Sequence, residues 1–89
     1  MLEPVNARDP DLARQLRRAA SSVPLNLREG RRRSGKDRAH HFRIAAGSAD
    51  EVVACLQVAQ AWGYAAPELV GPALATCDRI LAMTWRLTH

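Results

Sequence analysis

The sequence predicts an all-α fold, an antiparallel helical bundle with three helices in this chain. Alanine, leucine and arginine dominate the composition, and all three favour helices. Apolar residues recur at three- and four-residue steps in three segments, and no segment alternates as a strand would. With 89 residues, the chain is one small domain. We expect a single domain over 9–89, with helices at about 10–32, 35–62 and 67–87, after a loose lead-in at residues 1–8.

The first helix begins at Asp9-Pro10, where Asp9 suits the N-cap and proline the first helical position. A stripe of apolar residues then runs from Leu12 to Leu27. Pro24 interrupts this stripe without shifting its phase, which favours a continuous helix kinked at Pro24 over two short helices. Because the proline removes a backbone donor, we expect Ser21 and Ser22 to bond the carbonyls that it frees nearby.

The residues after the proline point to structural roles. Asn26 and Glu29 lie beside the expected kink, where they could bond freed backbone groups or the basic residues around them. We expect the helix to end near Gly30 or the arginines after it. Ser34 then suits the N-cap of the next helix, with Asp37 completing a capping box.

The second helix carries two apolar lines. One face holds Phe42, Ala45, Ala49, Val52, Val53 and Leu56, and the opposite line holds Ile44, Gly47, Cys55, Val58 and Trp62. A helix that is apolar on two sides is the central helix of the fold or a face for another subunit. Gly47 lies among small residues, which predicts a close helix approach there, and Gly63 suits a left-handed cap. Pro67 opens the third helix, which should pack antiparallel to the second because the connection is short.

The positive charge lies in one half of the chain. Residues 8–43 carry eleven Lys/Arg against four Asp/Glu, a net charge of +7, and the remainder carries −3. At 100° per residue the arginines of the first helix fall opposite its apolar stripe. The candidate nucleic-acid-binding residues are Arg14, Arg17, Arg18, Arg28, Arg31, Arg32, Arg33 and Lys36. Such a face would contact phosphates and discriminate poorly between sequences.

No enzyme, metal or cofactor pattern is present in the sequence. His40 and His41 are adjacent and therefore point apart on a helix, and no nucleophile has a placed base. Cys55 and Cys77 are best explained as reduced thiols inside helices. Since no signal peptide or apolar span is evident, we expect a cytoplasmic protein without membrane contact.

The motifs resemble a known family. "QLRRA" is followed by "SVPLNLREG", a basic linker, "HFRIAAGSADE" and "GY". This order is similar to that of the bacterial four-helix bundle protein family, which includes proteins encoded in ribosomal-RNA intervening sequences and Avd of diversity-generating retroelements. The residues that match its motifs include Pro24, Asn26, Glu29, Gly30 and Gly63. The resemblance implies a homo-oligomer, a ring-like pentamer, with RNA or DNA and a reverse transcriptase as partners.

The chain departs from this family at its start. The family has a further helix before "QLRRA", where this sequence has only Met1 to Arg8. We therefore expect three of the four helices and an open groove where the other would lie, unless another chain fills it. The sequence leaves two functions open: an oligomeric accessory protein that binds nucleic acid through its arginines, or a structural or protein-interaction bundle.

Overall fold

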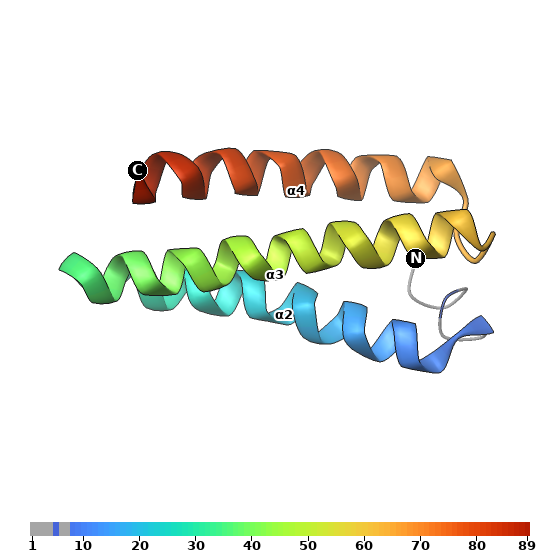
Figure 1. The fold of residues 1–89 in the computed structure, drawn as a ribbon, viewed down its shortest axis with the longest axis horizontal. Helices are drawn as coiled ribbons and strands as arrows, with labels where there is room; N and C mark the ends of the chain where they lie inside the picture. The colour runs from blue at the N-terminus through green and yellow to red at the C-terminus, as the bar shows by residue number, and fades with distance from the viewer. Residues whose placement is uncertain (1–4, 6–7) are drawn as a thin grey trace.

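The computed structural model of the chain describes Val5 and residues 8–89, which include three long helices. They are α2 (Pro10–Arg31), α3 (Gly35–Ala61) and α4 (Pro67–Thr88), and no strand occurs among the described residues (Figure 1). The predicted all-α class and three-helix bundle are confirmed. The expected lead-in at 1–8 lies outside the described residues except for Val5, which is fully buried, and Arg8, which is exposed.

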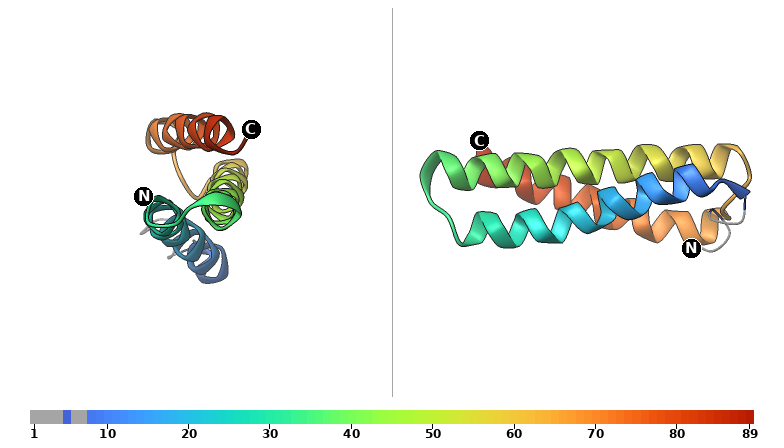
Figure 2. Two further views of the ribbon diagram at one scale, coloured as in Figure 1. Left: turned by 90° about the vertical axis from the view of Figure 1, so that its left-hand side faces the viewer. Right: turned by 90° about the horizontal axis from the view of Figure 1, so that it is seen from below.

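The helix α3 lies between the other two. Both α2 and α4 run antiparallel to α3 and pack against it, as the views in Figure 2 show. The end-on view places α2 and α4 on different sides of α3, so the three helices bend around an open side. The core is built from small and aliphatic side chains, among which Leu16, Ala59 and Leu56 are almost completely buried. Of the two alternatives for the second helix, the structure shows the first: it is the central helix of the bundle.

The helix α2 is continuous through its proline. Asp9 caps it, because its carboxylate accepts a hydrogen bond from the Leu12 amide at 3.0 Å. Pro24 lies inside the helix, so the alternative of two short helices is not adopted. In Figure 2 the helix bends in its middle, as the loss of one backbone donor and the ring clash predict.

The side chains near the proline do not repair its missing hydrogen bond. Pro24 leaves the carbonyl of Ala20 without its helical donor. Ser21 donates instead to the Arg17 carbonyl at 2.8 Å, and Asn26 donates to the Ser22 carbonyl at 2.9 Å. The expectation for the freed carbonyl was therefore wrong. Ala20 is exposed, so water can satisfy its carbonyl, and the serine and asparagine side chains are used elsewhere.

The glycines on either side of the α2–α3 connection have different roles. Gly30 does not end α2, which continues to Arg31; it is buried against Phe42, and a Cβ there would lie 2.6 Å from the ring. Ser34 is the N-cap of α3 but makes no side-chain capping bond, so the expected capping box does not form. Gly63 has a φ of +74°, which confirms the predicted left-handed cap of α3.

The second apolar line of α3 is corrected by the structure. Cys55 is buried in the core, whereas Ile44, Val58 and Trp62 are 36%, 42% and 70% exposed. Gly47 is also exposed, and a Cβ there would meet nothing within 4 Å. The close helix approach expected at Gly47 is therefore absent within the chain. α2 and α4 pack on the other sides of α3 and leave Ile44, Gly47, Val58 and Trp62 facing outward.

Candidate nucleic-acid interface

The outer face of α2 is basic along most of its length. The apolar stripe turns toward α3, and the helical period therefore places the arginines on the side facing solvent. Six of the candidate residues are exposed on this helix or at its C-cap: Arg14, Arg17, Arg18, Arg28, Arg31 and Arg32. At 1.5 Å per residue, this basic α2 face spans roughly 27 Å. A face of this length can meet several phosphates of one strand.

Two shallow hollows interrupt the basic α2 face. One, of about 460 Å³, is lined by Arg14, Arg17 and Arg18 with Leu25 and neighbouring polar residues. The other, of about 680 Å³, is lined by Pro24, Leu27, Arg28, Arg31 and Arg32. Both combine guanidinium groups with a small apolar floor, so the bend at Pro24 divides the basic face into two anion-facing concavities.

The arginines differ in how far carboxylates already engage them. Arg14 pairs with Asp11, and Arg32 lies 3.8 Å from the Glu29 carboxylate. Among the described residues no carboxylate lies within ion-pair distance of the remaining four arginines of the face, which are Arg17, Arg18, Arg28 and Arg31. These four guanidinium groups are the ones most available to an anion.

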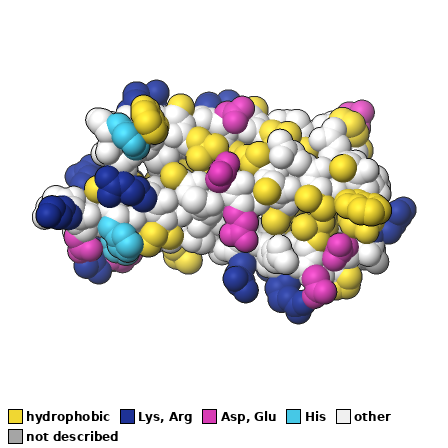
Figure 3. All heavy atoms as spheres, in the orientation of Figure 1, with side chains coloured by type: hydrophobic (Ala, Val, Ile, Leu, Met, Phe, Trp, Pro, Cys, Tyr) yellow, Lys and Arg dark blue, Asp and Glu magenta, His cyan; other side chains and the backbone are white. Residues whose placement is uncertain are grey.

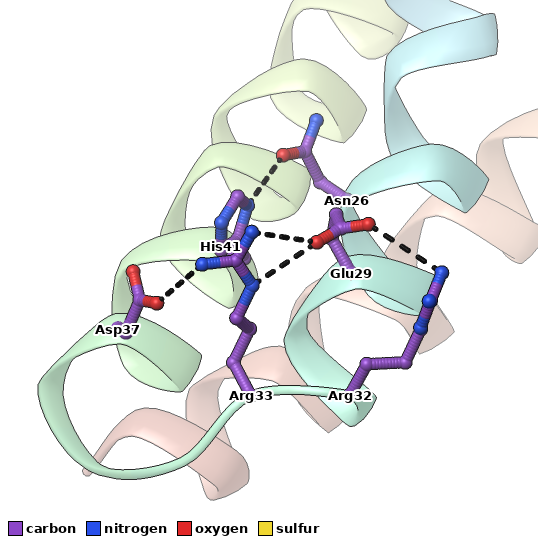
Figure 4. Close-up of polar contacts among 6 residues, drawn as sticks. All are labelled: Asn26, Glu29, Arg32, Arg33, Asp37 and His41. Carbon is purple, nitrogen blue, oxygen red and sulfur yellow. Dashed lines mark hydrogen bonds and ion pairs between the residues drawn. The ribbon is translucent and has the colours of Figure 1, made fainter.

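Arg33 has a structural role that the sequence did not reveal. Its guanidinium donates to Asp37 at 2.8 Å and to Glu29 at 3.1 Å, so it bridges the end of α2 and the start of α3 (Figure 4). The hydrogen bond that Arg33 donates to Asp37, followed by the one it donates to Glu29, raises the pKa of Arg33 above its ordinary value. The capping role expected of Asp37 is replaced by this contact. Lys36, in the first turn of α3, is exposed beside it.

A row of polar contacts holds α2 against α3 behind the basic face. Asn26 Oδ1 lies 3.1 Å from His41 Nδ1, as Figure 4 shows, and Ser48 donates to the Ser22 hydroxyl at 2.7 Å. Asn26 also donates to the Ser22 hydroxyl at 3.0 Å. The predicted structural role of Asn26 is thus an interhelical one. The sequence did not reveal that His41 meets Asn26 or that Ser48 meets Ser22, because these pairings depend on helix register rather than on spacing within one helix.

Further cations extend the basic region around the α2–α3 connection. Arg38 lies over the Phe42 ring, with its guanidinium carbon 5.3 Å from the centroid, and Arg43 is exposed one turn further on. On the face that Figure 3 shows, Lys and Arg side chains are most numerous at this end of the molecule, where Asp and Glu side chains lie beside them, and both kinds of charge also occur toward the other end.

The two cysteines are buried inside the bundle. Cys55 and Cys77 are buried free thiols, and burial raises the pKa of each, with smaller contributions from Glu51 and Asp78 respectively. Over Val5 and residues 8–89, no three His, Cys, Asp or Glu side chains are placed to hold a metal ion. None of the helices in that part of the chain is both long and apolar enough to cross a bilayer.

The described residues form a small helical bundle with one basic face, on α2. The family model described as 23S rRNA-intervening sequence protein matches residues 4–86. The chain belongs to that family, which the sequence motifs had indicated. Searches of curated proteins and of solved structures gave no match.

Proposed function

We propose that this chain is a non-enzymatic accessory protein that binds RNA or DNA through the basic α2 face. The observation that carries the proposal is the set of four exposed arginines on one helix face without a carboxylate partner among the described residues: Arg17, Arg18, Arg28 and Arg31. Guanidinium groups bind phosphates bidentately, and an extended row of them tracks a polyanion better than a single patch does.

The chemistry of the face favours recognition of the backbone rather than of bases. Phe42 is buried against Gly30, and Trp62 and Trp85 lie on α3 and α4 rather than among the α2 arginines. No aromatic residue of α2 is therefore available as a stacking platform. Binding should discriminate weakly between sequences and fall steeply with salt, because it releases counterions from phosphates.

We further propose that the protein is a cytoplasmic homo-oligomer. Support comes from the exposed apolar line of α3, where Ile44, Val58 and Trp62 face outward. Association along this line would bury it and repeat the basic α2 face around the assembly. The effective affinity for a polyanion would then exceed that of one copy. Light scattering that finds only the mass of one chain at micromolar concentration would exclude the oligomer.

The decisive experiment compares two double variants of equal charge. Arg17 and Arg18 are replaced by Gln in one, and Arg79 and Arg86 on α4 in the other; all four residues are exposed. Fluorescence anisotropy of labelled single- and double-stranded oligonucleotides is measured at several salt concentrations. The α2 variant should bind more weakly and show a flatter log–log salt slope, whereas the control should stay close to the parent protein. If both variants lose affinity equally, the loss comes from the lower net charge and not from the basic α2 face. If the parent protein does not bind at about 50 mM salt, the proposal is refuted.

A protein-interaction bundle without a nucleic-acid role is the second candidate. The observation that favours it is the amount of exposed apolar surface on α3 and α4, including Trp62 at 70% and Trp85 at 62% exposure. Large aromatic side chains are enriched at protein interfaces. In that case the arginines would meet acidic surfaces of a partner, and oligonucleotides would not bind at low salt.

A further inference from the structure

An apolar groove lies between α2 and α4. Its volume is about 440 Å³, and its walls carry Leu16, Val23 and Leu27 from α2 and Cys77 and Ile80 from α4. Val52 of α3 forms the floor. The groove exists because both outer helices pack on α3 while making few contacts with each other. It corresponds to the open groove that the sequence led us to expect.

The groove continues into a basic hollow at one end. Pro24 and Leu27 line both the apolar groove and the neighbouring hollow that holds Arg28, Arg31 and Arg32. A ligand that fills the groove and extends past Leu27 therefore meets the guanidinium groups of Arg28 and Arg31, which have no carboxylate partner among the described residues, and that of Arg32 near Glu29. The lining of the groove changes along its length from aliphatic to cationic side chains. A ligand that fits it therefore carries apolar residues along the groove and acidic residues at the cationic end.

The shape and the charge together define the occupant. The three helices bend around one open side, where a further parallel or antiparallel helix would contact α2, α3 and α4 at once (Figure 2). We propose that this groove binds an amphipathic helix from another protein, with apolar residues at helical spacing and acidic residues at the end that reaches Arg28 and Arg31. A second copy of this chain that presented α2 to the groove would fit less well, because the outer face of α2 is strongly basic.

Helix binding and nucleic-acid binding would share Arg28 and Arg31, but the apolar groove walls take no part in the proposed phosphate contacts. A change confined to the groove should therefore remove helix binding and leave oligonucleotide binding in place, which keeps the failure of one proposal distinguishable from that of the other.

The test uses designed amphipathic peptides of about 18 residues, long enough to form a helix of several turns. One set carries Leu and Ile at helical spacing with Glu at one end, and a second set is identical except that Lys replaces Glu. Fluorescence anisotropy should show that the acidic peptides bind the parent protein and that the basic ones bind at least about tenfold more weakly, because like charges meet at the arginines.

The matched variants are Thr76→Glu and Ala75→Glu. Both residues are exposed and adjacent on α4, but only Thr76 lines the groove. Thr76→Glu should weaken acidic-peptide binding by about tenfold or more, because a charge would be buried by the ligand, and Ala75→Glu should not. Circular dichroism should show an unchanged helix content for both variants. The double variant Arg28→Glu, Arg31→Glu should reverse the preference between acidic and basic peptides.

Three outcomes would overturn the inference. Equal binding of acidic and basic peptides would show that the groove has no preference for an acidic helix. Peptide binding that Thr76→Glu and Ala75→Glu leave equally intact would place the contact outside the groove. If no peptide binds, and light scattering shows an oligomer that Thr76→Glu converts to single chains, the occupant is a second copy; if no peptide binds a protein that is already monomeric, the groove does not take a helix.

Discussion

The two contacts that α3 makes with its neighbours differ in kind. Toward α2 the packing is directional: Asn26 meets His41, Ser48 meets Ser22, and Gly30 lies against Phe42. Toward α4, no side-chain hydrogen bond crosses between the helices in the part of the chain that the structure describes. Polar contacts fix the register of a helix pair, whereas apolar burial tolerates sliding. The α2–α3 pair is therefore the rigid half of the molecule, and α4 is the half whose position is less strictly specified.

The largest expected effect tests the tightest point of the α2–α3 contact. Gly30→Ala would place a Cβ 2.6 Å from the buried Phe42 ring, so either the ring or α2 must move. We expect a loss of about 1–3 kcal/mol in the free energy of unfolding, typical of overpacking in a core. Thermal or chemical denaturation followed by circular dichroism measures it.

The control for this prediction is Gly47→Ala on the outward side of α3. A Cβ at Gly47 meets nothing within 4 Å, so the substitution should gain up to about 1 kcal/mol from helix propensity alone. If Gly30→Ala lowers the free energy of unfolding and Gly47→Ala raises it, a close helix approach exists at Gly30 and not at Gly47. If Gly47→Ala is destabilising instead, a second copy packs closely against this glycine. The predicted close approach would then be made between chains rather than within one chain.

The polar contacts give the next effect. Asn26→Ala removes a donor to Ser22 and the partner of His41, and we expect a loss of about 1 kcal/mol. The matched change in α4 is Thr84→Val, since the buried Thr84 hydroxyl bonds only carbonyls of its own helix. These carbonyls keep their backbone donors, so the loss there should be smaller. Urea denaturation that shows Thr84→Val to be the more costly change would contradict the assignment of α2–α3 as the directional contact.

Sequence reasoning succeeded where a feature depends on one helix alone. The three helices, the cap at Asp9 and the left-handed Gly63 follow from residues close together in the chain. The roles of Gly30 and Gly47 did not, because each depends on whether another helix lies beside the glycine. A small-residue cluster around Gly47 looked like a crossing, and only the positions of α2 and α4 show that this side is open.

The candidate site shows the same division. The helical period alone placed the arginines on the outer face of α2. It did not show that Arg33 is held by Glu29 and Asp37, because those contacts depend on how the chain turns after Arg31. A cluster of arginines in sequence therefore contains members with different availability, and the three-dimensional turn decides which of them can meet a phosphate.

That difference predicts unequal effects on oligonucleotide binding. Arg31→Gln should lower the magnitude of the log–log salt slope by about 0.9 for duplex DNA if Arg31 neutralises one phosphate. Arg33→Gln should change the slope less, because Glu29 and Asp37 already offset its charge. Anisotropy titrations at several salt concentrations compare the two. A larger effect for Arg33 would mean that the carboxylates release it on binding.

The smallest expected effect is a difference in alkylation rate between the two cysteines, which reports how often the α2–α3 and α3–α4 contacts open. Burial raises the pKa of both thiols, so the folded protein holds these protons to higher pH than the unfolded chain does. The stability that follows is fully present below the ordinary thiol pKa of about 8.5 and is lost as pH rises through the raised values. Alkylation of both thiols should therefore be slow at neutral pH and accelerate on the alkaline side. Both thiols belong to the buried core; Cys55 lies on α3, and Cys77 lies on α4 and also lines the groove. Because α4 lacks directional contacts to α3, local opening should expose Cys77 more often, and mass spectrometry of alkylated peptides should find Cys77 modified first. Faster modification of Cys55 would show that the α2 side opens more readily, and would reverse the assignment of the rigid half.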